Sequence, residues 1–250
     1  MLILCRILCI AAGYGFGLFQ TAFIYGKMHG IDIRDYGSGN SGTTNALRTL
    51  GKKAGGLVLL GDFMKCFIAC MLVRLIFHYV KPDMTLVFVL YTALGVGLGH
   101  IFPFYMDFKG GKGIAVAAGI VVSMLNPWIF LICAFVFFSI LYATRYVSLS
   151  SILMLFSFYF SFYYFLRAGK LDVADLNYNY FECLLLLAVY VALAIFMHRE
   201  NIKRLMNHEE RVFTLKSEKK LQEEEEKFKE KYKGTVVEDD MPAFDETENK

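Results

Sequence analysis

Long apolar stretches dominate the first 200 positions of the chain. Four of them, at 7–26, 84–106, 114–144 and 146–166, contain no Asp, Glu, Lys or Arg. Two more, at 54–73 and 178–197, carry only Asp62 with Lys65 and Glu182, respectively. Because about 20 mostly apolar residues suffice for a helix to cross the hydrocarbon core, the pattern predicts an all-α polytopic membrane protein.

The stretch 114–144 is too long for one comfortable crossing and contains Asn126-Pro127. It is compatible with one tilted helix or with two shorter ones, and the distribution of positive charge distinguishes these alternatives. With two helices, one side of the membrane receives Lys27, Arg34, Arg48, Lys52, Lys53, Lys109, Lys112, Arg145, Arg199, Lys203, Arg204 and Arg211. The other side receives Arg6, Lys81, Arg167 and Lys170. Since cytoplasmic loops carry the excess of Lys and Arg, we expect seven transmembrane helices, the N-terminus outside and the C-terminus in the cytoplasm.

The amino-acid composition supports a membrane protein and shows that the C-terminal residues differ from the rest of the chain. Hydrophobic residues make up 56% of the 250 positions, and the mean hydropathy is +0.47. The first 198 residues hold only 22 of the 49 charges, whereas a soluble domain has about one charge in four residues. We therefore expect a membrane domain over residues 1–212 and a charged cytoplasmic tail over 213–250, helical over 215–233 and disordered from 236 onward.

The predicted cytoplasmic loop 37–48 reads Gly-Ser-Gly-Asn-Ser-Gly-Thr-Thr-Asn-Ala-Leu-Arg. Backbone N–H groups of such a loop can converge on an anion, and Arg48 can bind it bidentately. The stretch 37–42 matches G-x-G-x-x-G, but no strand precedes it, which argues against a dinucleotide site. A glycine-rich turn that leads into a helix is the structural alternative.

The remaining cytoplasmic segments also gather polar residues. Lys109 and Lys112 lie among glycines in 108–113, without the spacing of a nucleotide P-loop. Arg145 and Ser148 form a short loop, and His198 starts a segment in which Asn201 shares a helical face with it. Together these segments predict a binding site for a small phosphate-bearing ligand at the membrane boundary.

Three of these segments, 37–48, 99–113 and 198–210, resemble the motifs of the bacterial acyl-phosphate-dependent glycerol-3-phosphate acyltransferases, the PlsY family. The resemblance runs from residue 1 to about 211 and includes Asp62-x-x-Lys65. It implies acyl transfer from a fatty acyl phosphate to the 1-hydroxyl of glycerol 3-phosphate, which yields lysophosphatidate and inorganic phosphate. Neither a metal nor another cofactor is implied. Departures from the family pattern, such as Thr43, Cys66, Val116 and His208, remove no phosphate-binding side chain.

The resemblance also implies roles for individual residues. Ser38, Asn40 and Thr44 would hold the head of the acyl phosphate. The residues that would hold glycerol 3-phosphate or the departing phosphate are Arg48, Lys109, Lys112, Ser148, His198 and Asn201, with Glu210 in support. Of the whole set, Ser38, Arg48, His198 and Asn201 are expected to be catalytic. A phosphate oxygen of the substrate is the expected base.

The implied location is the bacterial inner membrane, with the site on the cytoplasmic side. Expected partners are the two substrates and the lipid bilayer, with no nucleic acid and no obligate protein partner. A transporter of a small phosphorylated metabolite is the main alternative, because it would use the same donors. Transporters often show internal repeats and broken helices at mid-membrane, and neither is evident in the sequence. A scaffold that presents its tail to partners is a third alternative, which leaves the glycine-rich loops without a purpose.

Overall fold

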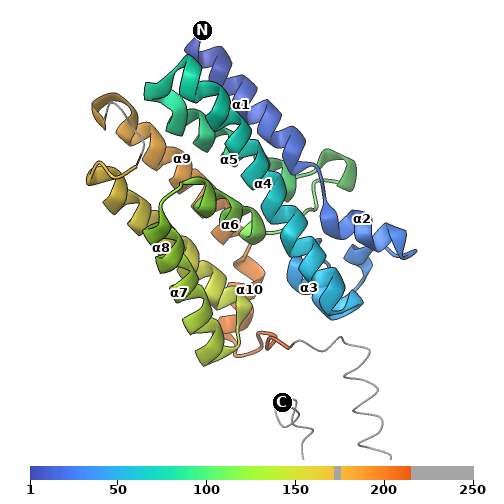
Figure 1. The fold of residues 1–250 in the computed structure, drawn as a ribbon. Coiled ribbons are helices and arrows are strands. Elements are labelled where there is room, and N and C mark those ends of the chain that lie inside the picture. The colour runs from blue at the N-terminus through green and yellow to red at the C-terminus, as the bar shows by residue number, and fades with distance from the viewer. Residues whose placement is uncertain (172–175, 215–250) are drawn as a thin grey trace, which may run out of the picture.

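The structure is a computed structural model that describes residues 1–171 and 176–214, all of whose regular elements are helical (Figure 1). The longer α-helices are α1 (Leu2–Gly17), α4 (Lys52–Val80), α5 (Thr85–Ile101), α7 (Pro127–Thr144), α8 (Val147–Arg167) and α9 (Leu176–Phe196). The shorter ones are α2 (Thr21–Met28), α3 (Thr43–Leu50), α6 (Ile114–Ser123) and α10 (Arg199–Met206). Single 3₁₀ turns are η1 (Ile33–Asp35), η2 (Pro82–Met84) and η3 (Phe104–Met106). The prediction of an all-α protein is confirmed for these ranges.

Six segments of the described chain are long and apolar enough to cross a membrane. They are Leu2–Met28, Lys52–Val80, Pro82–Met106, Pro127–Thr144, Val147–Arg167 and Asn179–Phe196. The first of the two crossings predicted within 114–144 corresponds to α6, which has only 10 residues. At 1.5 Å per residue it is about 15 Å long, about half of the hydrocarbon thickness. The chain is therefore a multi-pass membrane protein, and its described residues contain six full-length apolar segments and one short one.

The long apolar stretch 114–144 is divided at Asn126. Leu125 adopts a positive φ of 52°, and the side chain of Asn126 accepts hydrogen bonds from the backbone N–H groups of Trp128 and Ile129. Pro127 then occupies the first turn of α7, where its missing N–H costs nothing. A helix stop followed by an N-cap separates α6 from α7, in agreement with two helices in this stretch.

The first apolar stretch is also interrupted, which the sequence pattern did not predict. Helix α1 ends at Gly17, and α2 begins at Thr21 and turns away from it at the end of the molecule opposite the N-terminus (Figure 1). The freed carbonyl groups of Gly17 and Phe19 accept hydrogen bonds from Lys65, and Gln20 donates to Gly17 O, Gly99 O and His100 O. Partners from α4 and α5 thus stabilise the break.

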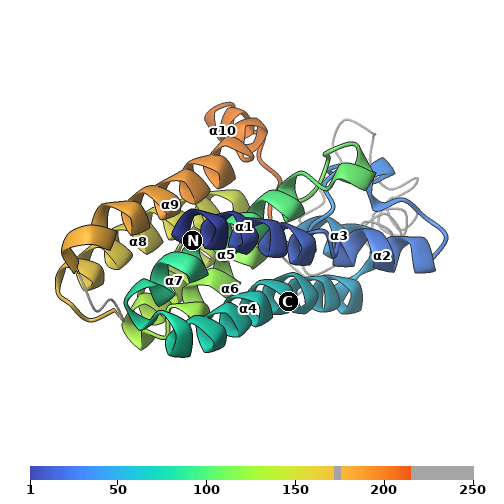
Figure 2. The same cartoon turned by 90° about the horizontal axis from the view of Figure 1, so that it is seen from above.

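Helix α5 forms the centre of the bundle, with α1, α4, α6 and α9 packed around it (Figure 2). Most of its residues are buried. Helix α1 approaches it very closely: a Cβ atom at Gly13 would lie 2.2 Å from Thr92 O, and one at Gly99 would lie 2.3 Å from Tyr14 O. Small residues on both helices permit this contact, as is typical of helices packed in membranes.

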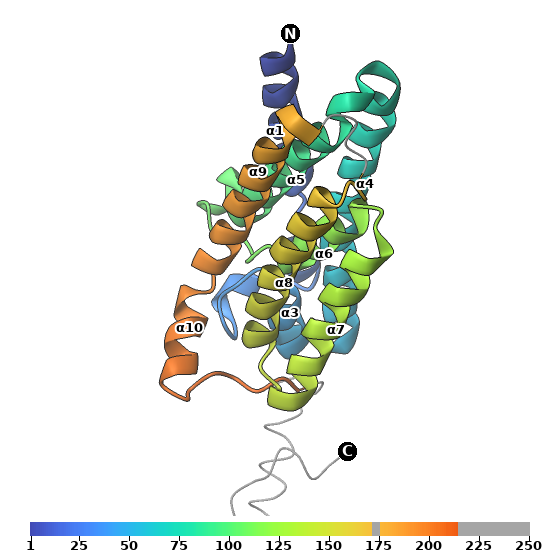
Figure 3. The same cartoon turned by 90° about the vertical axis from the view of Figure 1, so that its left-hand side faces the viewer.

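The short helices α2, α3 and α10 gather at the end of the bundle opposite the N-terminus (Figures 1 and 3). The chain beyond α10 returns to the α7–α8 turn, where Phe213 N donates to Arg145 O (2.8 Å). Nearly all of the predicted tail, including its predicted helix over 215–233, lies outside the described residues. The end that carries α3 and α10 also carries the predicted site residues.

Candidate active site

The glycine-rich loop before α3 is held in a fixed shape by Asn45. Its Oδ1 accepts a hydrogen bond from Ser38 N (2.7 Å), and its Nδ2 donates to Ile33 O and Tyr36 O (both 3.0 Å). Gly37 adopts a φ of +58°, and a Cβ atom there would lie 2.3 Å from Asn45 Oδ1. Glycine is therefore required at this position. Asn45 is a positioning residue that we did not predict as a site residue, although it stands three positions before Arg48 in the loop 37–48.

The N-terminus of α3 offers hydrogen-bond donors to an anion. Gly42 is the N-cap, and no side chain caps the first turn of this helix. In the described part of the chain, the buried hydroxyl groups of Ser41 and Thr43 have no hydrogen-bond partner. A free helix N-terminus with spare hydroxyls is a favourable place for a phosphate group. The predicted residue Thr44 lies in this first turn, whereas Ser41 and Thr43 were not predicted as site residues.

Of the other predicted residues in this loop, Ser38 and Asn40 lie together. Asn40 Nδ2 donates to Ser38 O (3.2 Å) and lies 3.5 Å from Ser38 Oγ. Both side chains are partly exposed. The loop is fastened to the next motif by Arg34, which binds Asp32 with two nitrogens and donates to Met106 O (3.0 Å). The Arg34 guanidinium lowers the pKa of Asp32 to about 2.

A second group of predicted residues forms one hydrogen-bonded network. Lys112 Nζ donates to Asn201 Oδ1, and Asn201 Nδ2 donates to Glu210 Oε1 (2.7 Å). Arg204 Nε donates to Glu210 Oε2 (3.0 Å). The network joins the loop before α6 to α10 and to the segment after it. Arg204 was not among the predicted site residues, although its spacing from Asn201 places both on one helical face.

The charges around Lys112 are mostly positive. Burial lowers the pKa of Lys112 to about 8; Glu210 opposes this shift, and the nearby Arg204 and Arg48 lower the pKa further. Arg48 on α3 is thereby placed within electrostatic reach of the network. An entering phosphate would supply the missing negative charge and would hold the proton on Lys112.

His198 joins this site as a neutral ring. It is only 3% exposed, and its pKa is lowered to about 4, first by burial and then by the charge of Lys112. Its Nδ1 lies 2.8 Å from Ala194 O, so the neutral ring is protonated at Nδ1. The remaining ring atom, Nε2, is therefore a hydrogen-bond acceptor at neutral pH.

Two predicted residues stand apart from the network. Lys109 is exposed on the loop that precedes Lys112. Ser148 is buried in the first turn of α8, where its Oγ has no hydrogen-bond partner in the described structure. A buried hydroxyl without a partner is costly, and a ligand would satisfy it. Among the described residues no group of three His, Cys, Asp or Glu side chains could hold a metal ion.

Comparison with known proteins decides the family. The profile of the family described as "Glycerol-3-phosphate acyltransferase" matches residues 7–208. The chain belongs to this family. The resemblance predicted from the motifs is confirmed, and the matched range ends close to the predicted boundary of the membrane domain.

Individual members of this family align with the chain over nearly their whole length. The glycerol-3-phosphate acyltransferase of Bacillus subtilis (strain 168) is 37% identical over 208 residues, which cover 81% of this chain and 95% of that protein. The one from Bacillus velezensis (strain FZB42) is 37% identical over 205 residues, with the same coverage.

Two solved structures share the fold. One is the crystal structure of PlsY, an integral membrane glycerol 3-phosphate acyltransferase, in its glycerol 3-phosphate form. Its TM-score is 0.70 at 34% identity, over 84% of this chain and 96% of that one. Its lysophosphatidic acid form gives a TM-score of 0.68 at 33% identity with the same coverage.

Proposed function

We propose that this protein transfers a fatty acyl group from an acyl phosphate to the 1-hydroxyl of glycerol 3-phosphate, giving lysophosphatidate and inorganic phosphate. The observation that carries the proposal is the Lys112–Asn201–Glu210–Arg204 network, to which Arg48 adds a further positive charge. Both substrates carry a phosphate, and the site supplies more positive than negative charge to receive it. Membership in the family and the substrate named in the relatives' descriptions support the same reaction.

The chemistry requires mainly positioning and neutralisation of charge. The hydroxyl oxygen of glycerol 3-phosphate attacks the acyl carbonyl carbon, the bond between that carbon and the phosphate oxygen breaks, and inorganic phosphate leaves. The hydroxyl proton passes to an oxygen of the departing phosphate. The oxygen that leaves with this phosphate gains negative charge as its bond to the acyl carbon breaks, and so becomes a stronger base than His198, whose pKa is about 4. Holding both phosphates beside cations lowers the barrier through orientation and electrostatic stabilisation.

The two phosphates are assigned to two parts of the site. Ser38, Asn40 and Thr44, with the N–H groups at the start of α3, bind the head of the acyl phosphate. Arg48, Lys112 and Asn201 bind the phosphate of glycerol 3-phosphate, with Glu210 holding Asn201 in place. His198 accepts the hydrogen bond of a glycerol hydroxyl through Nε2 and so orients it. Ser148 donates its unpartnered hydroxyl to the same ligand, and Lys109 attracts the anions from outside.

The membrane arrangement follows from the same proposal. We infer seven crossings, of which α6 is the short one, with the N-terminus outside and the site on the cytoplasmic side of a bacterial inner membrane. The excess of Lys and Arg on the side of α3 and α10 supports this direction. A transporter of phosphorylated metabolites receives less support, because α3 and α10, which carry Arg48, Asn201 and Arg204, lie away from the end of the bundle that carries the N-terminus (Figure 3).

The direct test uses purified full-length protein in detergent, supplied with a fatty acyl phosphate and labelled glycerol 3-phosphate. We expect labelled lysophosphatidate together with an equal amount of inorganic phosphate. The matched reaction with acyl-CoA and no acyl phosphate should form little product, because the network is built for a small phosphate. Comparable rates from acyl-CoA would refute the assigned donor. Failure to form lysophosphatidate with either donor would refute the proposed reaction.

A further inference from the structure

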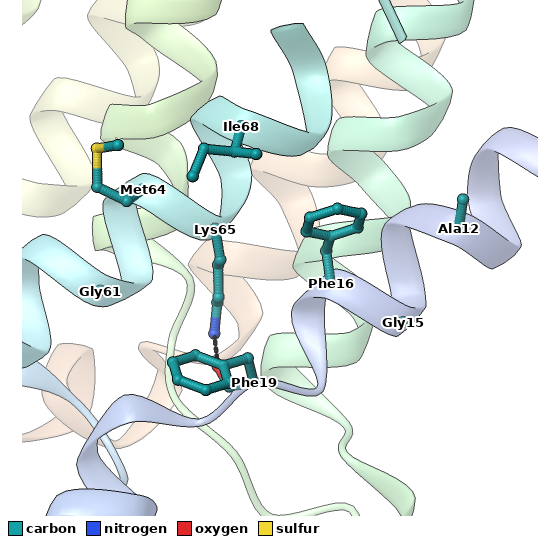
Figure 4. Close-up of a pocket in the computed structure, with 8 residues that line it drawn as sticks. All are labelled: Ala12, Gly15, Phe16, Phe19, Gly61, Met64, Lys65 and Ile68. Carbon is teal, nitrogen blue, oxygen red and sulfur yellow. Dashed lines mark hydrogen bonds between the residues drawn. The ribbon is translucent and has the colours of Figure 1, made fainter. Parts of the chain in front are cut away.

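A further ionic cluster, distinct from the network around Lys112, lies buried inside the bundle behind the loop that carries Lys112. Its centre is Lys65 of α4, whose Nζ lies 3.0 Å from Asp62 Oδ1 and 2.9 Å from Nδ1 of His100. All three side chains are nearly inaccessible to solvent. Lys65 also donates to Phe19 O (2.6 Å), at the break between α1 and α2 (Figure 4).

The outer face of this cluster is apolar. Lys65 borders a groove between α1 and α4 that is lined by Ala12, Gly15, Phe16, Phe19, Gly61, Met64 and Ile68 (Figure 4). No residue of the predicted site belongs to this lining. The amino group of Lys65 therefore points into the interior of the bundle, where it contacts His100 of α5 and the backbone at the end of α1.

His100 connects this cluster to the candidate site. Its carbonyl oxygen accepts a hydrogen bond from Gly111 N (3.1 Å), and the preceding Gly110 N donates to Ile101 O (3.0 Å). Its ring faces Gly111 so closely that a Cβ atom there would lie 2.3 Å from Nε2. Lys112, the residue that binds Asn201, follows directly.

We propose that Lys65 and His100 are positioning residues for acyl transfer: Lys65 fixes the ring of His100, and His100 fixes the Gly110–Gly111 backbone so that Lys112 reaches the network at Asn201. The proposal rests on the function assigned above to Lys112. In this proposal a buried polar cluster contributes to the reaction although none of its members belongs to the predicted site.

Stability alone does not account for the cluster. A buried ion pair costs so much desolvation that apolar residues of similar size are often as stabilising. A charged residue at this depth of a membrane helix is therefore a mark of function. The ion pair of Arg6 and Glu182 (2.6 Å) offers a comparison, because it joins α1 to α9 without contacting the Lys112 loop.

The test varies His100, which leaves the Asp62–Lys65 pair in place. His100→Leu fills the space against Gly111 but offers Lys65 no acceptor, whereas His100→Asn keeps an acceptor near the position of Nδ1 and loses bulk. Arg6→Met is the matched control for loss of an ion pair elsewhere in the membrane domain. Lys112→Met tests the underlying assignment. Each variant is purified in detergent, its thermal unfolding is recorded, and its kcat and KM for glycerol 3-phosphate are measured as a function of pH.

For His100→Leu we expect the KM for glycerol 3-phosphate to rise about tenfold with a much smaller change in kcat. His100→Asn should recover part of the loss, and Arg6→Met should keep the KM of the unaltered protein. A second readout is the pH at which the KM for glycerol 3-phosphate begins to rise on the alkaline side. A loosened loop exposes Lys112 to water, so its pKa should increase from about 8 although Glu210, Arg204, Arg48 and His198 still face it.

Three results would overturn the proposal. The first is an unchanged KM and pH profile in folded His100→Leu while Lys112→Met is impaired. The second is better function in His100→Leu than in His100→Asn, since bulk and not the bond to Lys65 would then matter. The third is an equal rise of KM in Arg6→Met. An unimpaired Lys112→Met would instead refute the function assigned to Lys112.

Discussion

Two ionic clusters near opposite ends of the bundle differ in one instructive respect. Toward the N-terminal end of α1, Arg6 binds Glu182 through two nitrogens, at 2.6 and 2.8 Å, and Tyr91 donates to the same carboxylate (2.7 Å). At the other end, the described side chains whose charges shift the pKa of Lys112 are one carboxylate, Glu210, and two cations, Arg204 and Arg48. The first cluster balances its own charge. The second, in the function proposed above, attracts an anion.

Charge balance thus separates a structural contact from a binding site more reliably than the presence of buried charges does. Arg6 and Glu182 hold α1 against α9, and a ligand would gain nothing there. Around Lys112 the charges of the described residues are mostly positive, so a phosphate bound as proposed above would offset the cost of bringing these cations together. Four predictions test this contrast.

The largest effect should come from removing a cation of the cluster around Lys112. We expect Arg48→Ala and Lys112→Met each to lower kcat/KM for glycerol 3-phosphate about 10- to 150-fold, because a charge-assisted hydrogen bond contributes about 1.5–3 kcal/mol. Arg48→Lys should restore little if both guanidinium nitrogens contact one phosphate. Steady-state kinetics in detergent measure this, with Lys170→Met as a control for loss of a lysine elsewhere. Near-normal kcat/KM in folded Arg48→Ala and Lys112→Met would remove the contrast between the clusters.

A change of pH should have the next largest effect. Lys112 loses its positive charge as pH rises through about 8, whereas glycerol 3-phosphate, with a second pKa of about 6, is already a dianion there. KM for glycerol 3-phosphate should therefore rise above pH 8. Glu210→Gln removes a charge that raises the pKa of Lys112, and so should move this rise to lower pH; Arg204→Met should move it to higher pH. Shifts in the opposite directions would contradict the assigned charges.

His198 should contribute less than the cations, because it is neutral at pH 7. One neutral hydrogen bond contributes about 0.5–1.5 kcal/mol, so His198→Ala should lower kcat/KM about 2- to 12-fold. Since the pKa of His198 is about 4, the rate should show no His titration between about pH 5.5 and about pH 7.5. A pKa near 6.5 in the pH–rate profile that is lost in His198→Ala would show that the ring becomes charged in the reaction. His78→Ala, at the far end of α4, is the matched histidine control and should keep its activity.

The self-balanced cluster should affect stability and not catalysis. Arg6→Met leaves Glu182 partly buried without its cation, so the unfolding midpoint in detergent should fall by about 2–4 °C for each kcal/mol lost. The KM for glycerol 3-phosphate should stay within about twofold of the unaltered protein. The double variant Arg6→Met/Glu182→Gln should be less destabilised than Arg6→Met, because no charge is left unpaired. A large loss of turnover in Arg6→Met would show that the two clusters are coupled.

Much of the architecture was accessible from the sequence, because lipid imposes a strict requirement. A crossing helix must satisfy its own backbone and present an apolar surface, so the apolar stretches marked α5, α8 and α9 to within a few residues, whereas α4 runs on to Val80, beyond its predicted end at 73. The break at Asn126 was also visible in the sequence, because Asn followed by Pro is typical of the start of a helix. The break between α1 and α2 left none, since its carbonyl groups are satisfied by Lys65 and Gln20 through contacts with distant helices.

The candidate site was predicted only in its parts. Residue types and motif order selected Lys112, Asn201 and Glu210, but local spacing could not show that they form one network or that Lys109 stays exposed outside it. Asn45 and Arg204 were overlooked because their importance lies in what they hold in place, not in their own chemistry.

The sequence by itself determined the membrane class, the family and the residue types of the site, because hydrophobic length and motif order are properties of the linear chain. Only the tertiary structure decided how these charges meet. Electrostatic energy depends on distance and burial. Both are set by packing: α1 against α9 pairs Arg6 with Glu182, whereas α3, α10 and the loop before α6 bring several cations around Lys112.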